Sequence, residues 1–136
     1  MTEHTLTEAA KAMYTSRLAN DVAATRAHFT QDAVLGLAGA AEDPSLSFAP
    51  DQGDGVTAIL EVLIGTWQWH TMTVHDQVIS GDKAAFRYTL DTTHIPTGER
   101  IQTEISDHIA WNGEKITSFI EFVDTGMVER LTNQSS

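Results

Sequence analysis

The sequence has no cysteine, only 3 proline residues among 136, and few positive charges. Without cysteine the chain cannot form disulfides, perform thiol chemistry or bind a metal through sulfur, which fits a reducing compartment. No apolar run approaches the roughly 20 residues that a membrane span needs. The opening stretch MTEHTLTEAAKAM lacks the basic and apolar regions of a secretory signal. We therefore expect a cytoplasmic protein that does not contact membranes.

Positive charge is scarce, with 8 Lys and Arg residues against 19 Asp and Glu residues and a formal net charge of −11. Such a chain repels a phosphate backbone on average, so we expect no nucleic-acid partner. The sequence also lacks glycine-rich phosphate loops and nucleophile elbows, and its 6 histidines follow no HExxH pattern. These absences argue against nucleotide cofactors, serine-hydrolase chemistry and metal sites, so we predict no cofactor and no metal.

What the chain does contain is enough apolar material for one core. Hydrophobic residues make up 41% of the sequence, and no internal repeat divides it. A chain of this length and composition is typical of one compact domain. We therefore predict a single domain over residues 1–136.

Helical patterns occupy the first half of the chain. Thr5 begins a capping-box pattern, and apolar side chains at three- and four-residue steps predict a helix over residues 5–20. Asp21 can cap a shorter second helix over residues 22–29. A single apolar stripe predicts a third helix over residues 55–69.

Strand patterns account for most of the remainder. Residues 33–39 predict a short buried strand, and residues 40–55 predict a loop. Between residues 70 and 124, the turn signals SGDK, IPTGER and WNGEK separate four runs rich in Val, Ile, Thr and aromatic residues. This alternation predicts an antiparallel meander of four strands.

Two acids stand out near the end of this meander, in the stretch SDHIAWNGEKITSFIEFVD. If residues 112–115 form a four-residue loop, Asp107 lies opposite Ile120, and Thr103 lies opposite Asp124. Both acids then lie on the apolar face. A carboxylate aimed into a core costs several kcal/mol of desolvation or takes up a proton, so this placement indicates a use inside the core.

The preceding hairpin supports the same facing. A loop of residues 96–99 pairs Tyr88 with Asp107 and Phe86 with Ile109. Tyr88 is then expected beside Asp107. A two-residue loop at either turn would change these pairings.

The segments FTQDAV, GVTAIL, ISGDKAAFRY and WNGEKITSFIEFVD occur in this order along the chain. The order resembles the nuclear-transport-factor-2-like superfamily, particularly its SnoaL-like and ketosteroid-isomerase-like branches, over residues 6–131. The resemblance implies an α+β fold, a cone-shaped α+β barrel in which three N-terminal helices pack in the concave face of a curved antiparallel sheet around an apolar cavity. Its members include isomerases, cyclases, dehydratases, epoxide hydrolases and non-catalytic domains.

The resemblance to ketosteroid isomerase is partial. DHIAWNG is similar to the segment whose aspartic acid stays protonated and donates a hydrogen bond to the enolate, which implies that role for Asp107. The companion tyrosine lies on the first helix, where this chain has Tyr14, although an ungapped count reaches Met13. The general base of that enzyme follows the FTQDAV segment, and residues 35–38 here include no acid or base.

A different resemblance concerns Asp124. In SnoaL-like polyketide cyclases and limonene-epoxide-hydrolase-like proteins, an aspartate at the end of the last strand is the general acid or base, and IEFVD resembles its setting. The Arg-x-Asp of the epoxide hydrolases is broken here, because Arg87 is followed by Thr89 and Asp91 is displaced.

His70 resembles the catalytic histidine of bile-acid-dehydratase-like members. Two facings are open for this strand. Apolar alternation through Met72 and Val74 would turn His70 inward, whereas a two-residue turn at Gly81 and Asp82 would turn His75 inward instead.

We therefore hypothesise a cofactor-independent isomerase, cyclase, dehydratase or hydrolase that transfers protons on an apolar cyclic or polyketide-like molecule held in an internal cavity. The candidate catalytic residues are Asp107, Asp124, Tyr14 and His70. The candidate substrate-binding residues are Tyr88, Phe86, Ile105, Ile109, Trp111, Ile120, Phe122 and Trp67. The alternative is a non-catalytic ligand-binding or dimerisation module in which the acids orient a ligand or pair with Arg87 or Arg100.

The expected partner is a second copy of the chain. An open, curved sheet has an outer face that solvent covers poorly, and the predicted register places Ala110, Phe119 and Val123 on it. We predict a homodimer through this face.

Overall fold

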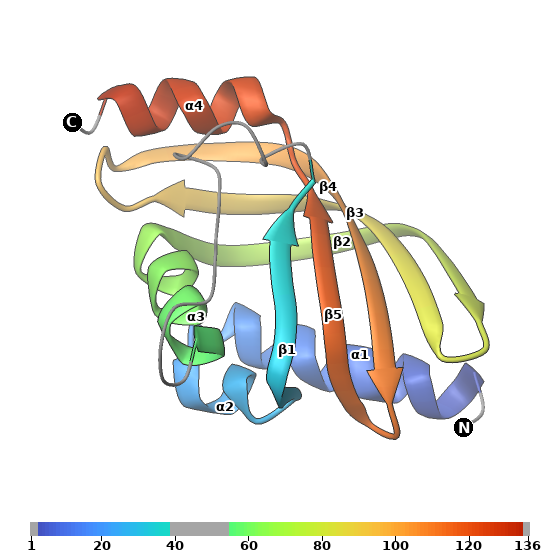
Figure 1. Cartoon of the computed structure of the whole chain (residues 1–136). Helices are drawn as coiled ribbons and strands as arrows, with labels where there is room; N and C mark the ends of the chain where they lie inside the picture. The colour runs from blue at the N-terminus through green and yellow to red at the C-terminus, as the bar shows by residue number, and fades with distance from the viewer. Residues whose placement is uncertain (1–2, 39–54, 135–136) are drawn as a thin grey trace.

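The computed structural model describes residues 3–38 and 55–134, so the loop predicted over residues 40–55 lies, apart from Gly55, outside the described residues. Figure 1 shows an α+β arrangement in which one curved sheet covers the helices, as predicted. The elements in chain order are α1 (Glu3–Leu18), α2 (Val22–Arg26), β1 (Phe29–Leu37), α3 (Gly55–Thr66), β2 (Trp67–Ser80), β3 (Lys83–His94), β4 (Glu99–Asn112), β5 (Lys115–Phe122) and α4 (Thr125–Gln134).

The five strands form one sheet in the order β1-β5-β4-β3-β2. The meander from β2 to β5 is antiparallel, as predicted, but β1 pairs with β5 in parallel, so the sheet is mixed. The long connection between β1 and β5 allows this, because it returns the chain to the same end of the sheet before β5 begins. In Figure 1, β1 and β5 run side by side in the same direction.

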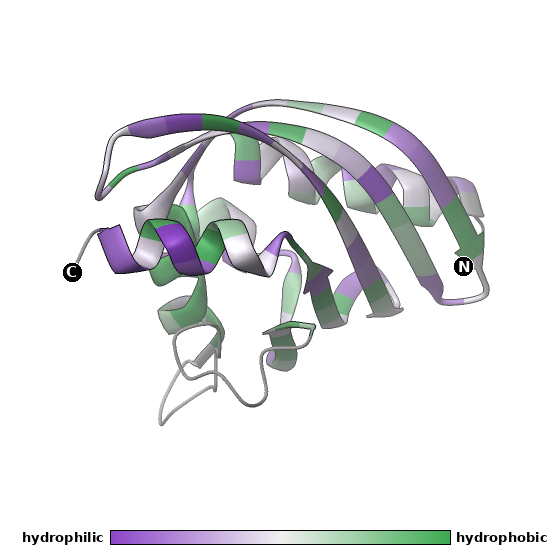
Figure 2. Cartoon of the chain, turned by 90° about the horizontal axis from the view of Figure 1, so that it is seen from above, coloured by the Kyte–Doolittle hydropathy of each residue, from purple (hydrophilic) through white to green (hydrophobic). Residues whose placement is uncertain are grey.

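The helices lie on the concave side of the sheet. Figure 2 shows the strands arching over them. The buried face of α1 carries Leu6, Ala10, Met13, Tyr14 and Arg17, while α3 buries Val56, Ile59, Leu60 and Ile64. This spacing follows the predicted stripes and places the core between the helices and the sheet. No helix of residues 3–38 and 55–134 combines the length and apolar character that crossing a membrane requires.

The end of α1 is held to the sheet by Asn20. This residue has φ of 56°, in the left-handed region that asparagine tolerates better than most residues. Its Oδ1 accepts a hydrogen bond from the Trp69 backbone N–H at 3.0 Å, and its Nδ2 donates to the Trp69 carbonyl at 3.2 Å. The carboxamide thus satisfies two backbone groups of the edge strand β2 and fixes Trp69 beside α1.

Several predicted boundaries are wrong. The helix predicted to reach residue 69 ends at Thr66, because Trp67 and Trp69 enter β2 and pair with His94 and Thr92 of β3. Phe29 begins β1 instead of ending α2, since α2 stops at Arg26. The C-terminal helix α4 was not predicted.

The register of the β3–β4 hairpin differs from the prediction by two residues. Tyr88 pairs with Ile105, and Phe86 pairs with Asp107. Because the shift is even, every side chain keeps its predicted face. Tyr88 and Asp107 still point to the same side, and their side chains are hydrogen-bonded.

The register of the β4–β5 hairpin contains a bulge that reverses the predicted faces of β5. Trp111 pairs with Ile116 as predicted, but the register shifts between Ala110 and Trp111, so Asp107 pairs with Glu121 instead of Ile120. One extra residue in a strand turns all later side chains to the opposite face. The predicted inward facing of Ile120, Phe122 and Asp124 is therefore wrong.

The bulge also changes the outer face of the sheet. Phe119 and Val123, predicted to point outward, line the inside of the molecule, whereas Ala110 lies on the outer side with Ile120 and Val78. Val78 is 62% exposed and Phe122 is 47% exposed. Apolar side chains thus remain on the convex face, although they are not the predicted set.

Candidate functional site

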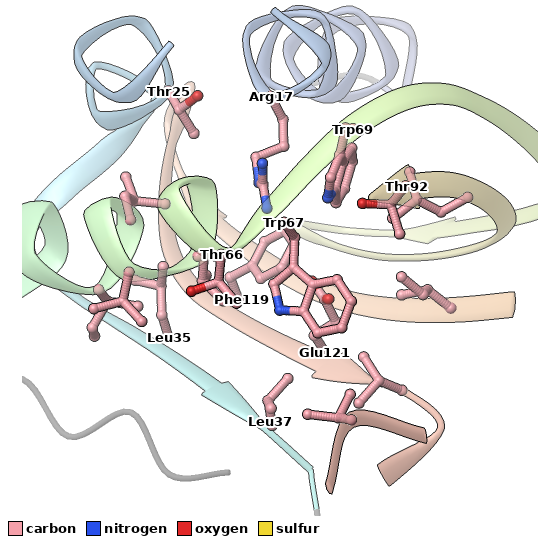
Figure 3. Close-up of a pocket in the computed structure, with 18 of the residues that line it drawn as sticks. Arg17, Thr25, Leu35, Leu37, Thr66, Trp67, Trp69, Thr92, Phe119 and Glu121 are labelled. Atoms are coloured by element: carbon pink, nitrogen blue, oxygen red, sulfur yellow. The ribbon is translucent and has the colours of Figure 1, made fainter. Parts of the chain in front are cut away.

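A cavity of about 320 Å³ lies between the concave face of the sheet and the helices. Most of its lining is apolar and comes from α1, α3, β1, β2, β5 and α4. The side chains with polar groups that line it are Tyr14, Arg17, Thr25, Thr66, Trp67, Trp69, Thr92, His94, Thr103, Glu121 and Thr132. Figure 3 shows Arg17 projecting from α1 into the cavity, toward Trp67 and Glu121.

Arg17 is the cation of the cavity. Arg17 lies on the buried stripe of α1, and only 7% of the residue is exposed. Its guanidinium carbon lies 4.3 Å from the centroid of the Trp69 ring, a cation–π contact. Burial lowers the pKa of Arg17 to about 10, against the opposing effect of Glu121, so the group stays charged at neutral pH.

Glu121 is the carboxylic acid that lines the cavity. It lies on β5, where the bulge turns it to the concave face opposite Asp107. Burial raises the pKa of Glu121, and the nearby Arg17 and the Asp107 carboxyl oppose that rise. An apolar wall on one side and a guanidinium on the other give this carboxyl the balanced environment that proton-transfer groups need.

Asp107 is fully buried and lies behind the cavity wall. The hydroxyls of Tyr14 and Tyr88 both donate hydrogen bonds to its Oδ2 at 2.6 Å. Burial raises the pKa of Asp107 well above its ordinary value, and the neighbouring Glu121 raises it further, against the two tyrosine hydrogen bonds. The pKa of Asp107 is raised more strongly than that of Glu121, so of these two neighbouring carboxyls Asp107 is expected to keep its proton to the higher pH.

The tyrosines remain neutral. Burial raises the pKa values of Tyr14 and Tyr88 well above the ordinary value, and their hydrogen bonds to Asp107 and the nearby Glu121 act in the same direction. Their rings pack edge to face, with centroids 5.6 Å apart. Both hydroxyl protons are therefore committed to Asp107.

At the other end of the cavity lies His94. It is buried against Trp67, with ring centroids 4.7 Å apart, and its Nδ1 lies 2.9 Å from the Thr97 hydroxyl oxygen. Burial lowers the pKa of His94, against the effect of Glu99, which favours the neutral ring. Among the described residues, no three His, Asp or Glu side chains gather as a metal site.

The SnoaL-like domain profile matches residues 10–119. This chain belongs to the SnoaL-like family. Several solved structures share its fold at low sequence identity. A candidate isomerase from Bacillus subtilis superposes with a TM-score of 0.77 at 17% identity, covering 100% of this chain and 98% of that one.

Two further structures illustrate the range of this fold. IdmH, a candidate polyketide cyclase from Streptomyces antibioticus, gives a TM-score of 0.68 at 20% identity, with 93% and 97% of the two chains covered. A protein from Catenulispora acidiphila with a ketosteroid isomerase-like fold, bound to trimethylamine, gives 0.67 at 12% identity, with 84% and 83% covered. No curated protein sequence matches the chain.

Two of the four candidate catalytic residues of this SnoaL-like protein meet, and two lie elsewhere. Tyr14 and Asp107 are in direct contact. Asp124 is exposed beyond β5, where its Oδ1 accepts a hydrogen bond from the Met127 backbone N–H at 3.1 Å and so caps α4. His70 does not line the cavity and bonds the Thr93 hydroxyl at 2.8 Å.

Neither facing predicted for the β2 histidines brings one into the cavity. Two bulges in β2 break its alternation, and the exposed His75 bonds the Thr89 hydroxyl at 2.6 Å. The predicted substrate-binding residues divide into three groups. Ile105 and Trp67 line the cavity. Tyr88, Phe86, Ile109 and Trp111 are buried in the core beside it. Ile120 and Phe122 do not line the cavity, because the bulge turns both to the other face of the sheet.

Three ionisable residues that line the cavity, Arg17, Glu121 and His94, were not among the candidates. Arg17 had a signal, since it continues the apolar stripe of the first helix where solvent is not expected. Glu121 stands between two apolar residues of a strand, and only the bulge makes it face inward. His94 precedes a turn, and nothing in its sequence neighbours distinguishes it.

Asp107→Asn is expected to change how stability depends on pH. Folding raises the pKa of Asp107, so the folded protein binds the proton more tightly, and the free energy of unfolding falls as pH rises from the unfolded pKa toward the folded one. Asn has no such proton. The stability of the variant relative to wild type should therefore rise by up to about 1.4 kcal/mol per pH unit in this interval. Urea unfolding from about pH 4 to about pH 8 measures this difference. A difference that falls with pH would indicate an ionised, stabilised carboxylate instead.

Proposed function

We propose that this cavity is the active site of a cofactor-independent enzyme that moves protons on an apolar, enolisable ketone of cyclic or polyketide-like character. One observation carries the proposal: the carboxyl of Glu121 and the guanidinium of Arg17 line the same, mostly apolar cavity. A general base and a group that stabilises an oxyanion are the two parts that enolisation needs.

The proposed reaction keeps the charge of the cavity constant. Glu121 removes a proton from the carbon beside the carbonyl, and the electron pair of the C–H bond passes to the carbonyl oxygen. The negative charge thus moves from the Glu121 carboxylate to the substrate oxygen, and both positions interact with Arg17. Because the guanidinium is already buried, little reorganisation is needed when the charge moves.

The neutral Glu121 then has two uses. When the ketone carries a β,γ double bond, the enolate is conjugated with it, and returning the proton to the γ-carbon completes an isomerisation. If the enolate carbon first attacks a second carbonyl of the same molecule, a carbon–carbon bond closes a ring, and Glu121 returns the proton to the new alkoxide. Both outcomes regenerate the ionised carboxylate without any added reactant.

Asp107 serves this chemistry as a positioning residue. It does not line the cavity, so a direct hydrogen bond from Asp107 to the enolate is not part of the proposal. Its retained proton removes a second negative charge from beside Glu121. The two tyrosine hydrogen bonds hold the Asp107 carboxyl in place behind the base.

The fold relatives support this reaction class. One is described as a candidate isomerase and another as a candidate polyketide cyclase, both reactions that can pass through an enolate. The similarity concerns the fold, and the reaction is inferred from the cavity of this chain.

Hydrogen–deuterium exchange tests the proposal without knowledge of the natural substrate. Bicyclic ketones such as 2-tetralone are incubated with the protein in D₂O, and deuterium at the carbon beside the carbonyl is followed by mass spectrometry. We expect exchange above the buffer rate, proportional to protein concentration and suppressed by bound competitors. If ketones bind, as shown by thermal shift, and never exchange, the cavity belongs to a ligand-binding module.

We also propose that the protein forms a homodimer through the convex face of the sheet. Val78, Ile120 and Phe122 leave apolar surface there, and a second copy would cover it. Light scattering at micromolar concentration is expected to give about twice the chain mass of 14.9 kDa. A mass near 14.9 kDa would exclude the dimer.

A further inference from the structure

Arg17 is almost fully buried, yet the contacts of its guanidinium do not compensate for the loss of water. Within the described residues its Nη1 is buried and has no hydrogen-bond partner, and no ion pair to it is formed. A guanidinium has five N–H donors, and leaving them unpaired away from water is costly. Such a group lining a cavity indicates that a ligand supplies the missing acceptor.

We propose that this cavity binds small apolar carboxylic acids, with the carboxylate on Arg17 and one proton taken up by Glu121. The proposal rests on the proposed function in one respect, namely that the cavity is the substrate site. The carboxylate of the ligand would occupy the position of the enolate oxygen in the proposed reaction, because each brings a negatively charged oxygen to the guanidinium of Arg17.

The orientation of Arg17 favours a carboxylate over a single-oxygen ligand. The guanidinium carbon of Arg17 lies 4.3 Å from the centroid of the Trp69 ring, which closes that side to a ligand, and the N–H donors of a guanidinium lie in its plane. A planar fork of donors matches the two oxygens of a carboxylate, and such charge-assisted pairs are the strongest hydrogen bonds in proteins.

The rest of the cavity selects an apolar body. Leu60, Trp67, Phe119 and Val123 contribute to walls that come from four different elements. The volume of about 320 Å³ is at the lower end of small-molecule pockets, about 300–1,000 Å³. A fused bicyclic or substituted monocyclic acid is the size class that fits.

Charge balance explains the proton. The groups facing Glu121 are Arg17 and Tyr14 from α1, Tyr88 from β3 and Asp107 from β4. His94 of β3 lines the same cavity, while the lining residues of α2, α3, β1 and α4 are not titratable. Arg17 is thus the one cation among these facing groups that stays charged at neutral pH. A second anion would leave an excess negative charge unless Glu121 is neutralised, and its raised pKa makes it the group that takes the proton.

The test compares 2-naphthoate with its neutral analogue 2-naphthylmethanol. Isothermal titration calorimetry gives the affinity, and repetition in two buffers of different ionisation enthalpy gives the protons taken up. We expect the acid to bind about 10- to 100-fold more tightly than the alcohol below the pKa of Glu121, the range for charged hydrogen bonds. About one proton should be taken up per acid bound above that pKa.

Three variants assign the effect to residues. In Glu121→Gln, proton uptake should disappear, and the affinity for the acid should no longer fall about tenfold per pH unit at high pH. Arg17→Met should remove the preference for the acid, and Arg17→Lys, which keeps the charge, should retain part of it. Arg87→Met is the matched control, because it removes one exposed positive charge paired with Glu104 on the convex face.

The outcomes separate this proposal from the proposed function. Equal affinity for acid and alcohol, acid binding without proton uptake, an unchanged preference in Arg17→Met, or no binding of either probe would each overturn it. Deuterium exchange of ketones is measured separately and can succeed when acid binding fails. Conversely, tight acid binding with proton uptake and no ketone exchange would support the site and overturn the enzyme.

Discussion

Replacement of Glu121 by Gln is expected to lower protein-dependent deuterium exchange of ketones about 10²–10⁴-fold, the usual cost of removing a general base. Gln has nearly the shape of Glu and keeps a polar group on the cavity wall, but it cannot accept the proton. Ligand binding should therefore be retained while exchange is lost. Exchange rates at saturating ketone, with binding followed by Trp fluorescence because Trp67 and Trp69 line the cavity, measure the two effects separately.

Asp124→Asn is the matched control for this loss. Like Glu121→Gln, it replaces one acid near the end of β5 by its amide. Asp124, however, is exposed and caps the N-terminus of α4, and asparagine is an equally good capping residue. We expect this variant to exchange at the wild-type rate. If Asp124→Asn loses exchange and Glu121→Gln keeps it, the assignment of the base to Glu121 is wrong, and the sequence-based assignment to Asp124 is restored.

The second large effect is expected on stability. Asp107→Leu should destabilise the protein by roughly 2–5 kcal/mol near pH 5, because two buried tyrosine hydroxyls lose their common acceptor at about 1–3 kcal/mol each. Leucine has the same number and branching of side-chain heavy atoms as aspartate, so the change opens no cavity, and its larger methyl groups add some overpacking in this buried site. Urea unfolding followed by far-UV circular dichroism measures the loss.

Asp107→Asn isolates the acceptor in this comparison. Its carboxamide oxygen can still accept from Tyr14 and Tyr88, so near pH 5 we expect at most about half of the loss seen for leucine. Removing both hydroxyls from the leucine variant, with Tyr14→Phe and Tyr88→Phe, should restore part of the stability, since no donor is then left unpaired. Equal losses for Asn and Leu would show that the two hydrogen bonds do not contribute.

The buried Tyr–Asp cluster could be predicted because it depends only on side-chain facing. Tyr88 and Asp107 share a face under any even shift of the β3–β4 hairpin, so the error of two residues did no harm. Tyr14 lies on the apolar stripe of the first predicted helix, and its inward direction follows from that periodicity. The SnoaL-like fold was recognisable from the order of helices and strands, which also does not depend on the exact register.

The inward-facing acid of β5 could not be predicted, because its facing depends on one irregularity of the backbone. Nothing in WNGEKITSF signals that an extra residue opposes the partner strand between Ala110 and Trp111. In a hairpin without this extra residue Asp124 would face inward, whereas with it Glu121 faces inward. The α4 helix was missed because its pattern is short, and its cap Asp124 was interpreted as a strand residue. Tertiary packing decides both features, and local sequence does not.

The bulge in the β4–β5 hairpin also makes the cavity sensitive to chain length. Deleting one residue between the bulge and Phe119 would return β5 to simple alternation and exchange its inward set, so that Ile120 and Phe122 would replace Phe119 and Glu121 in the cavity. No single substitution alters so many lining positions at once. Within this fold, insertions and deletions of single residues near this hairpin are therefore an efficient evolutionary route between catalytic and purely binding cavities, since they can withdraw the acid and preserve the strand.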